Sequence, residues 1–410
     1  MATFNWRATE TSSSSARSLG SSTCCPRSPR SSSRNRGARL YRFAFVLEQT
    51  LGHVAHARNI RRALDQHADE IAATLIPVDY RRPAGIRGRL PGLRTWSYEA
   101  SRQARSELNR HLGQGAYQAI FIHTQVAALL AGGIMKRVPT VLSLDATPSN
   151  FDAQGGPYGH RRNGVLSESV KRRINQHVFG RAAVLVTWCR WAAESLVSDY
   201  GVRAEKIEVV HPGVDTDLFR PQERAALNEK PIRILFVGGD FERKGGSDLL
   251  QAMLRLGPDT HLHVVTARPV AVPAGISCSV HTGLGPQSPE LVSLYRSADI
   301  FALPSRGDCF PQAVAEGLAC GLPVVATTVG AIPEMVREGV NGHLVPPGEP
   351  RALAAALEAL VSSSAKRHEM GHWSRVLAEQ EHSAITNNRR IFELMARLAS
   401  TGPALAAAPA

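Results

Sequence analysis

The sequence predicts an α/β protein with two doubly wound parallel sheets, and three observations support this class. The chain has 410 residues, which suits two domains better than one because domains usually hold about 100 to 200 residues. Hydrophobic residues make up 43% and charged residues 20%, a balance that allows two buried cores and excludes a disordered chain. Short apolar runs alternate with helical stretches, as parallel strands do with their crossover helices. We therefore expect two Rossmann-like domains facing a cleft.

Residues 1–39 are Ser- and Arg-rich and carry seven arginines against one acid, Glu10. They show no hydrophobic periodicity, so we expect a disordered tail. A transit peptide, an upstream extension or a misassigned start would have the same composition.

The N-terminal domain is predicted to span residues 40–216. It opens with a strand over 42–48, a helix over 53–67 and a second strand over 71–78. Later apolar runs predict four more buried strands, over 119–123, 140–145, 184–187 and 207–211. The spacers between them are long enough for crossover helices, which favours a parallel sheet.

A polar stretch over residues 217–231 is the predicted linker, and the C-terminal domain follows over 232–370. Strands are predicted over 232–238, 261–266, 277–281, 300–303 and 323–326, and helices over 246–256, 289–297 and 311–319. Beyond Pro350 the pattern predicts a helix over 352–360 and a long one over 371–398. We expect residues 371–400 to pack back across the two domains.

The segment from Pro304 to Pro323 carries the densest chemical signal, because it runs from a buried strand into a helix. Pro311 suits the first helical position, and the amides of a helix N-terminus attract anions. Two acids lie near this predicted phosphate site, Asp308 before the helix and Glu316 within it. One acid can contact a sugar and the other ribose hydroxyls, although a helix cap and a core-paired acid are equally ordinary roles.

A glycine-rich turn follows the first strand of the second domain, from Gly238 to Gly245. Arg243 and Lys244 within it can neutralise a diphosphate, whereas a bland alternative is a solvated pair of cations. The GxGxxG fingerprint is absent from the turn, which disfavours a nicotinamide enzyme.

These motifs together resemble glycosyltransferase family 4. The resemblance rests on the glycine turn, on the acid pair Asp308 and Glu316, and on the segments 323–327, 332–336 and 341–342. It covers most of residues 41–400 and is specific to the family but not to a substrate. It implies the GT-B fold and a retaining, metal-independent transfer of a hexose from a nucleotide-diphosphate sugar to a hydroxyl of a saccharide, lipid or small-molecule acceptor.

The resemblance also implies roles for individual residues. Lys244 would bind the donor diphosphate, Asp308 the donor sugar and Glu316 the ribose, with Asp145 near the anomeric carbon. Lys244, Asp308 and Asp145 are the catalytic candidates. The donor-side candidates besides Lys244 and Glu316 are Gly239, Arg243, Gly283, Phe310, Gln312 and Ala313. The acceptor-side candidates are Gly52, His53, Thr147 and His160, and no metal ligand or cofactor is expected.

The chain departs from the family pattern at three places. Asp308 stands for the family's first glutamate, and Gly239 stands where many members carry an arginine, which Arg243 would replace. Pro311 follows Phe310 in place of a glycine and removes one amide donor. The amides of Phe310, Gln312 and Ala313 would then hold the phosphate.

The net charge of +13 raises further alternatives. Nucleic-acid binding is disfavoured, since no motif supports it and aromatic residues make up only 6%. Basic residues gather in the predicted first domain, at 81–94, 161–162 and 171–173. They favour an anionic membrane surface as a partner, against a solvated basic face or an anionic soluble acceptor.

The cysteines and the lack of a long apolar run predict a cytoplasmic protein, which the basic residues would allow to sit peripherally on the inner membrane face. Rivals on the same fold are a sugar phosphorylase, a nucleotide-sugar epimerase and an inactive scaffold. Glu316 favours a ribose-bearing donor over a phosphorylase, and Lys244 argues against an inactive site.

Overall fold

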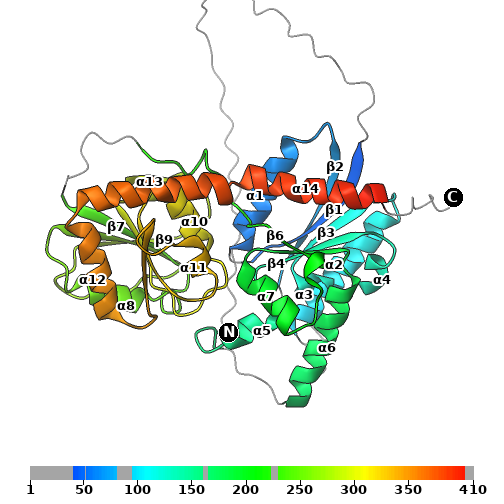
Figure 1. Ribbon diagram of the computed structural model, residues 1–410, viewed down its shortest axis with the longest axis horizontal. Helices are drawn as coiled ribbons and strands as arrows, with labels where there is room; N and C mark the ends of the chain where they lie inside the picture. Colours follow the sequence, from blue (N-terminus) through cyan, green and yellow to red (C-terminus); the bar gives the residue numbers. More distant parts are fainter. Residues whose placement is uncertain (1–39, 51, 81–94, 160–164, 223–229, 402–410) are drawn as a thin grey trace, which may run out of the picture. The chain divides into compact units, whose positions relative to one another are not determined.

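The computed structural model describes residues 40–50, 52–80, 95–159, 165–222 and 230–401. In these ranges the chain forms two six-stranded sheets in which every strand pairing is parallel (Figure 1). The predicted fold class is therefore confirmed.

The N-terminal sheet has the strand order β2-β1-β3-β4-β5-β6. Its strands are β1 (Tyr41–Glu48), β2 (Ile71–Val78), β3 (Ala119–His123), β4 (Thr140–Leu144), β5 (Val184–Thr187) and β6 (Ile207–Val209). Its helices are α1 (His53–Asp65), α2 (Trp96–Leu112), α3 (Gln125–Ala128), α4 (Gly132–Met135), α5 (Pro148–Ala153), α6 (Val165–Arg181) and α7 (Arg190–Ser198). Strands β1, β3 and β4 are buried almost throughout, which explains their unbroken apolar runs.

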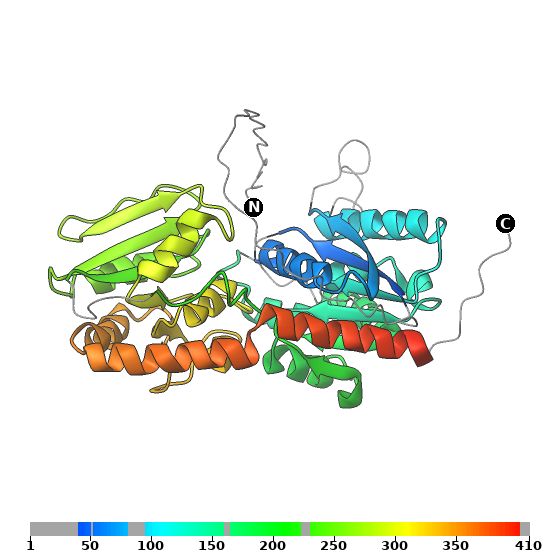
Figure 2. The same cartoon turned by 90° about the horizontal axis from the view of Figure 1, so that it is seen from above.

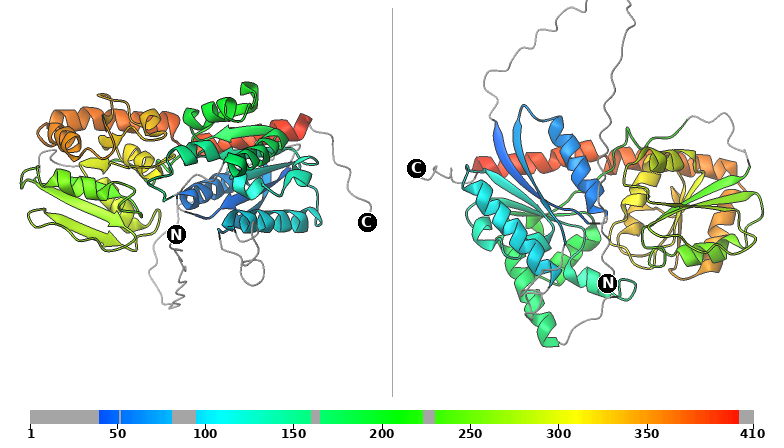
Figure 3. Two further views of the ribbon diagram at one scale, coloured as in Figure 1. Left: turned by 90° about the horizontal axis from the view of Figure 1, so that it is seen from below. Right: turned by 180° about the vertical axis from the view of Figure 1, so that it is seen from behind.

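Alternate residues of β1 enter two different cores. Phe43 and Phe45 pack with α1 and the last helix of the chain, α14 (Ala384–Thr401), on one face. Ala44 and Val46 pack on the other face with α2, α3 and α6. Figure 3 shows α2 and α6 in the view from behind. A helix from the end of the chain thus completes the first core.

The C-terminal sheet has the order β12-β11-β10-β7-β8-β9 around a core of its own. Its strands are β7 (Ile232–Val237), β8 (Thr260–Thr266), β9 (Cys278–Thr282), β10 (Ile300–Leu303), β11 (Val324–Thr327) and β12 (Gly342–Val345). Its helices are α8 (Gly246–Met253), α9 (Pro289–Ser297), α10 (Gln312–Ala319), α11 (Ile332–Met335), α12 (Pro350–Val361) and α13 (Ser364–Glu381). The predicted strands all occur, and β12 is an additional one.

The predicted long helix over 371–398 is two helices, α13 and α14, with a break at His382 and Ser383 (Figure 2). The backbone there turns to pair with the segment that leaves the first sheet. Val214 N donates to His382 O at 2.6 Å, and Ala384 N donates to Val214 O at 2.9 Å. The two chain segments that connect the sheets therefore hold each other.

Candidate active site

All donor-side candidates except Gly283 lie where the strand order of the C-terminal sheet reverses. Strands β7 and β10 are neighbours, but the chain continues from β7 to one edge and from β10 to the other. The loops after such a pair diverge at the carboxyl ends of the strands and leave a place for a ligand. The Gly238–Gly245 turn follows β7, and the segment that begins at Pro304 follows β10.

Lys244 and Asp308 connect these two loops. The Lys244 ammonium donates a hydrogen bond to Asp308 Oδ2, and both side chains are largely buried. Burial lowers the pKa of Lys244, and the Asp308 carboxylate opposes that effect. The pair places a cation and an acid side by side at the predicted phosphate site.

The N-terminus of α10 supplies hydrogen-bond donors beside this pair. The helix begins at Gln312, one residue later than predicted. Pro311 is therefore the N-cap residue and not the first helical residue. First-turn amides have no partner within a helix. The buried Gln312 side chain also has no hydrogen-bond partner for its Nε2 within the described ranges. Both features favour an anionic ligand at this helix end.

Glu316 lies one turn further along α10 and is buried beside Tyr295. Burial raises its pKa to about 7, and Tyr295 only partly offsets this. A carboxyl group buried away from water lowers the stability of the folded state when it is ionised. That cost is typical of a side chain retained for function.

We expect Glu316→Gln to stabilise the ligand-free protein in a pH-dependent way. Burial raises the pKa from 4.5 to about 7, so the folded state binds the extra proton and Glu316 destabilises it increasingly as pH rises through that range. The variant should gain about 3 kcal/mol over wild type at pH 8 and under about 1 kcal/mol at pH 5. Urea unfolding at both pH values measures this. Equal gains at both pH values, or the same gain from Glu358→Gln at an exposed position of α12, would contradict it.

Arg243 is held by three neighbours. Its Nη1 donates to Gly307 O at 2.7 Å, its Nε donates to Asp240 at 3.3 Å, and its guanidinium lies 4.5 Å from the ring centre of Tyr158. The guanidinium therefore braces the two loops. Its contact with a diphosphate remains a prediction.

Two residues of the N-terminal half complete the donor side and were missed by the sequence analysis. Gln154 Oε1 accepts the backbone N–H of Asp308 at 2.8 Å, and the Tyr158 hydroxyl lies 4.0 Å from Cys309 Sγ. Both follow α5 in a turn with no distinctive pattern. Only the folded chain brings this turn to the glycine loop.

The acceptor-side loop meets the donor-side helix at Gly52. A Cβ atom at Gly52 would lie 3.4 Å from Cγ of Gln312. His53 begins α1 directly after it, with Nε2 3.7 Å from Asp145 Oδ2 and Nδ1 2.5 Å from His123 Nε2. Burial raises the pKa of Asp145, and His53 opposes that effect. The predicted residues Gly52, His53 and Asp145 thus come together.

Buried aromatic rings lie beneath His53. His123 stacks on Trp188 with ring centres 4.9 Å apart, and the ring centre of Trp188 lies 6.0 Å from that of Phe310. His123 was not predicted as a site residue. It ends the buried strand β3, much as the predicted Asp145 follows the buried strand β4. Phe310 also stacks on His211 at 5.5 Å. The segment between β10 and α10, which contains Phe310, is thereby packed against the N-terminal half.

A buried carboxylate, Glu48, ends β1 nearby and was also missed. It accepts hydrogen bonds from the hydroxyls of Thr50, Tyr80 and Thr124. Glu48 was predicted only as the last residue of the strand over 42–48, with no further role. These three hydroxyl donors satisfy the carboxylate within the protein.

The remaining candidates have simpler surroundings. The Thr147 hydroxyl is fully buried, caps α5 and bonds to Ser195 at 2.6 Å, so its contact with an acceptor stays a prediction. Gly283 follows β9 with φ 78°, and a Cβ atom at Gly239 would meet no atom within 4 Å. His160 lies outside the described residues.

Glu334 on α11 joins the two halves through the start of α7. Its carboxylate accepts the backbone N–H groups of Arg190 and Trp191, both at 2.8 Å. A carboxylate suits this position because a helix N-terminus carries positive partial charge.

We expect Glu334→Ala to lower the free energy of unfolding by about 1 to 2 kcal/mol, since both amides lose their acceptor. Chemical denaturation measures this. Glu393→Ala, at an exposed position of α14, is the control, and equal effects of the two changes would contradict the capping role.

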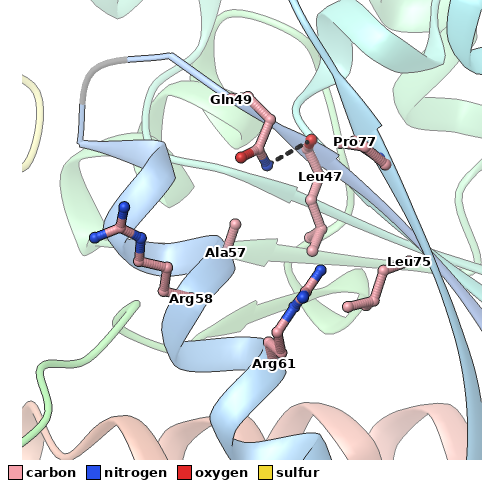
Figure 4. A pocket seen from close by; sticks show the side chains of 7 residues that line it. All are labelled: Leu47, Gln49, Ala57, Arg58, Arg61, Leu75 and Pro77. Carbon is pink, nitrogen blue, oxygen red and sulfur yellow. Dashed lines mark hydrogen bonds between the residues drawn. The ribbon is translucent and has the colours of Figure 1, made fainter. Parts of the chain in front are cut away.

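A pocket of about 250 Å³ lies between α1 and the edge of the N-terminal sheet (Figure 4). Gln49, Arg58 and Arg61 contribute its polar atoms. Arg58 also donates to Pro286 O of the C-terminal half. The pocket lining does not include His53 or Asp145, so the pocket is separate from the candidate site.

Of the basic groups, only residues 171–173 are described. Lys171 pairs with Asp152 and Glu168, whereas Arg172 and Arg173 are exposed near Val170 and Ile174. No helix of the described chain is long and apolar enough to cross a membrane. In the same ranges, no three His, Cys, Asp or Glu side chains gather to hold a metal.

Comparison with solved structures identifies the fold. Sucrose-phosphate synthase from Thermosynechococcus elongatus superposes with a TM-score of 0.70 at 17% identity, over 88% of this chain and all of that one. Anabaena Alr3699/HepE, in complex with UDP-glucose, gives a TM-score of 0.62 at 18% identity over 87% and 99%. The two sheets and this likeness define a GT-B fold.

Sequence comparison identifies the family. The Glycosyltransferase Family 4 model matches residues 24–218, and the Glycosyl transferases group 1 model matches residues 231–363. A D-inositol 3-phosphate glycosyltransferase of Xylanimonas cellulosilytica is 34% identical over 296 residues, 66% of this chain and 70% of that protein. The protein belongs to glycosyltransferase family 4.

A second relative, the D-inositol 3-phosphate glycosyltransferase of Mycobacterium sp. (strain KMS), is 38% identical over 206 residues. This match covers 46% of each chain. The chain thus spans about half the length of several curated relatives that it matches.

Proposed function

We propose that the protein is a retaining glycosyltransferase that moves a hexose from a nucleotide-diphosphate sugar to a hydroxyl group of a carbohydrate or lipid-linked acceptor. The observation that carries the proposal is the cluster of Lys244, the α10 N-terminus and the unpartnered Gln312 amide at the reversal of strand order. This cluster offers positive charge and free donors to a diphosphate.

The chemistry follows from where charge develops. As the bond between the sugar and the diphosphate breaks, the leaving group gains negative charge. Lys244 and the α10 amides would stabilise it, because they are already oriented and partly shielded from water. Asp308 would contact the donor sugar, and Glu316 would accept hydrogen bonds from the ribose. The diphosphate itself would take the proton of the acceptor hydroxyl, so no protein nucleophile is required.

The acceptor side would consist of Gly52, His53 and Asp145. The names of two relatives specify D-inositol 3-phosphate, a phosphorylated polyol, and this similarity is what supports a polyol acceptor.

A transfer assay tests the proposal. The full chain is incubated with UDP-, GDP- and ADP-hexoses and candidate polyol acceptors, with and without EDTA. We expect one nucleotide to be released with formation of an α-linked product, and EDTA to leave the rate unchanged. Phosphate-dependent release of a sugar 1-phosphate would support the phosphorylase alternative instead. Interconversion of free nucleotide sugars without an acceptor would support the epimerase.

A further inference from the structure

Two imidazole rings face each other across the acceptor side of the site. His53 is the first residue of α1, and His123 is the last residue of β3. His53 Nδ1 lies 2.5 Å from His123 Nε2, while the other nitrogen of His53 faces Asp145 Oδ2 at 3.7 Å. The ring of His53 is thus oriented from both sides.

The surroundings of His123 favour its neutral form. Burial, together with the neighbouring His53 and His56, lowers its pKa well below the ordinary value. A neutral imidazole carries its proton on one nitrogen only, so one of its nitrogens donates and the other accepts. Its Nδ1 lies 3.3 Å from Ser143 Oγ, and a hydroxyl that donates to Nδ1 leaves the proton of His123 on Nε2, toward His53.

The ring of His123 is itself enclosed by other side chains. It is 1% exposed and stacks on Trp188 with an interplanar angle of 7°. A fixed ring that bonds to Nδ1 of His53 leaves Nε2 as the nitrogen that faces the site. Such a partner selects the tautomer and the orientation of a functional histidine.

We propose that His123 is a positioning residue that holds His53 in its Nε2–H tautomer, in which Nδ1 accepts from His123 Nε2–H and Nε2–H faces the Asp145 carboxylate and the acceptor hydroxyl. What His53 then does for transfer rests on the proposed function. How His53 is held does not.

Two substitutions separate the hydrogen bond from packing. In His123→Gln the longer amide reaches the former Nε2 position and can keep the bond to His53. In His123→Asn the shorter amide reaches only the Nδ1 position beside Ser143, so the bond to His53 is lost. His56→Gln is the matched control, because His56 is equally buried and contacts Trp188 and His123 but has no hydrogen bond to His53.

The experiment records ring-nitrogen NMR spectra of the full chain labelled with ¹⁵N-histidine, with the His53 signals assigned from His53→Gln. We expect a single His53 tautomer in wild type, His123→Gln and His56→Gln, and a tautomer mixture in His123→Asn. Averaged tautomers in wild type would overturn the proposal even if His123→Asn fails to fold. A mixture in His56→Gln would overturn it too.

Turnover gives the second readout. We expect His123→Asn to lower the transfer rate by at least about tenfold and His123→Gln to restore most of it, with KM for the sugar nucleotide unchanged in both. Full activity of a folded His123→Asn would contradict the proposal. If no variant and no wild-type protein transfers sugar, the proposed function fails, while the NMR result still decides how His53 is held.

Discussion

Lys244→Ala is expected to lower turnover of the sugar nucleotide by at least about 100-fold, because the leaving diphosphate loses its buried cation. The same change leaves the Asp308 carboxylate buried without its partner, which lowers the free energy of unfolding by about 3 to 5 kcal/mol. Release of nucleotide under saturating donor measures the first effect, and urea unfolding measures the second.

A double variant separates the two effects. Lys244→Ala with Asp308→Asn removes the unpaired charge, so stability should recover while turnover stays low. Lys230→Ala is the control, since Lys230 precedes β7 at its opposite end and forms an exposed pair with Asp259. Equal loss of turnover in Lys230→Ala, or recovery of turnover in the double variant, would contradict the role of Lys244.

Gly245→Ala is expected to destabilise the protein by about 3 kcal/mol or more, since it combines left-handed backbone with steric overlap. Gly245 has φ 77°, and a Cβ atom there would lie 1.8 Å from the Pro304 carbonyl oxygen. The loop after β10 would have to move away from Lys244. The free energy of unfolding in urea is the measurement.

Gly239→Ala in the same turn is the matched control. No atom lies within 4 Å of the position of its Cβ, so the change should alter stability by less than about 0.5 kcal/mol. If the two alanine variants unfold alike, close packing of the glycine turn against Pro304 is not what fixes Lys244.

The sequence predicted secondary structure best where buried residues form a short continuous run. Strands over 71–78, 119–123, 184–187 and 300–303 were predicted with the bounds that the structure has, because each is a continuous apolar run. The break at His382 was missed because the apolar pattern continues through it, and only pairing with Val214 interrupts the helix. The helix over 289–297 was predicted with its bounds, and the other predicted helices differ by a few residues at one or both ends.

The site residues also divide into those that a local motif predicts and those that it does not. Lys244, Asp308 and Glu316 lie in motifs whose spacing marks them, and the structure brings all three to one region of the C-terminal sheet. Gln154, Tyr158 and His123 belong to segments with ordinary composition. Their proximity to the site arises from tertiary packing, which no local pattern encodes.

The most direct test of the donor site is a thermal-shift comparison of UDP-, GDP- and ADP-hexoses on wild type, Lys244→Ala and Glu316→Gln. A ligand that binds only the folded state raises the melting temperature by mass action. We predict that one nucleotide class stabilises wild type and that both variants lose this shift, although Glu316→Gln melts higher without ligand. A shift with inorganic phosphate and with no nucleotide would contradict a sugar-nucleotide site.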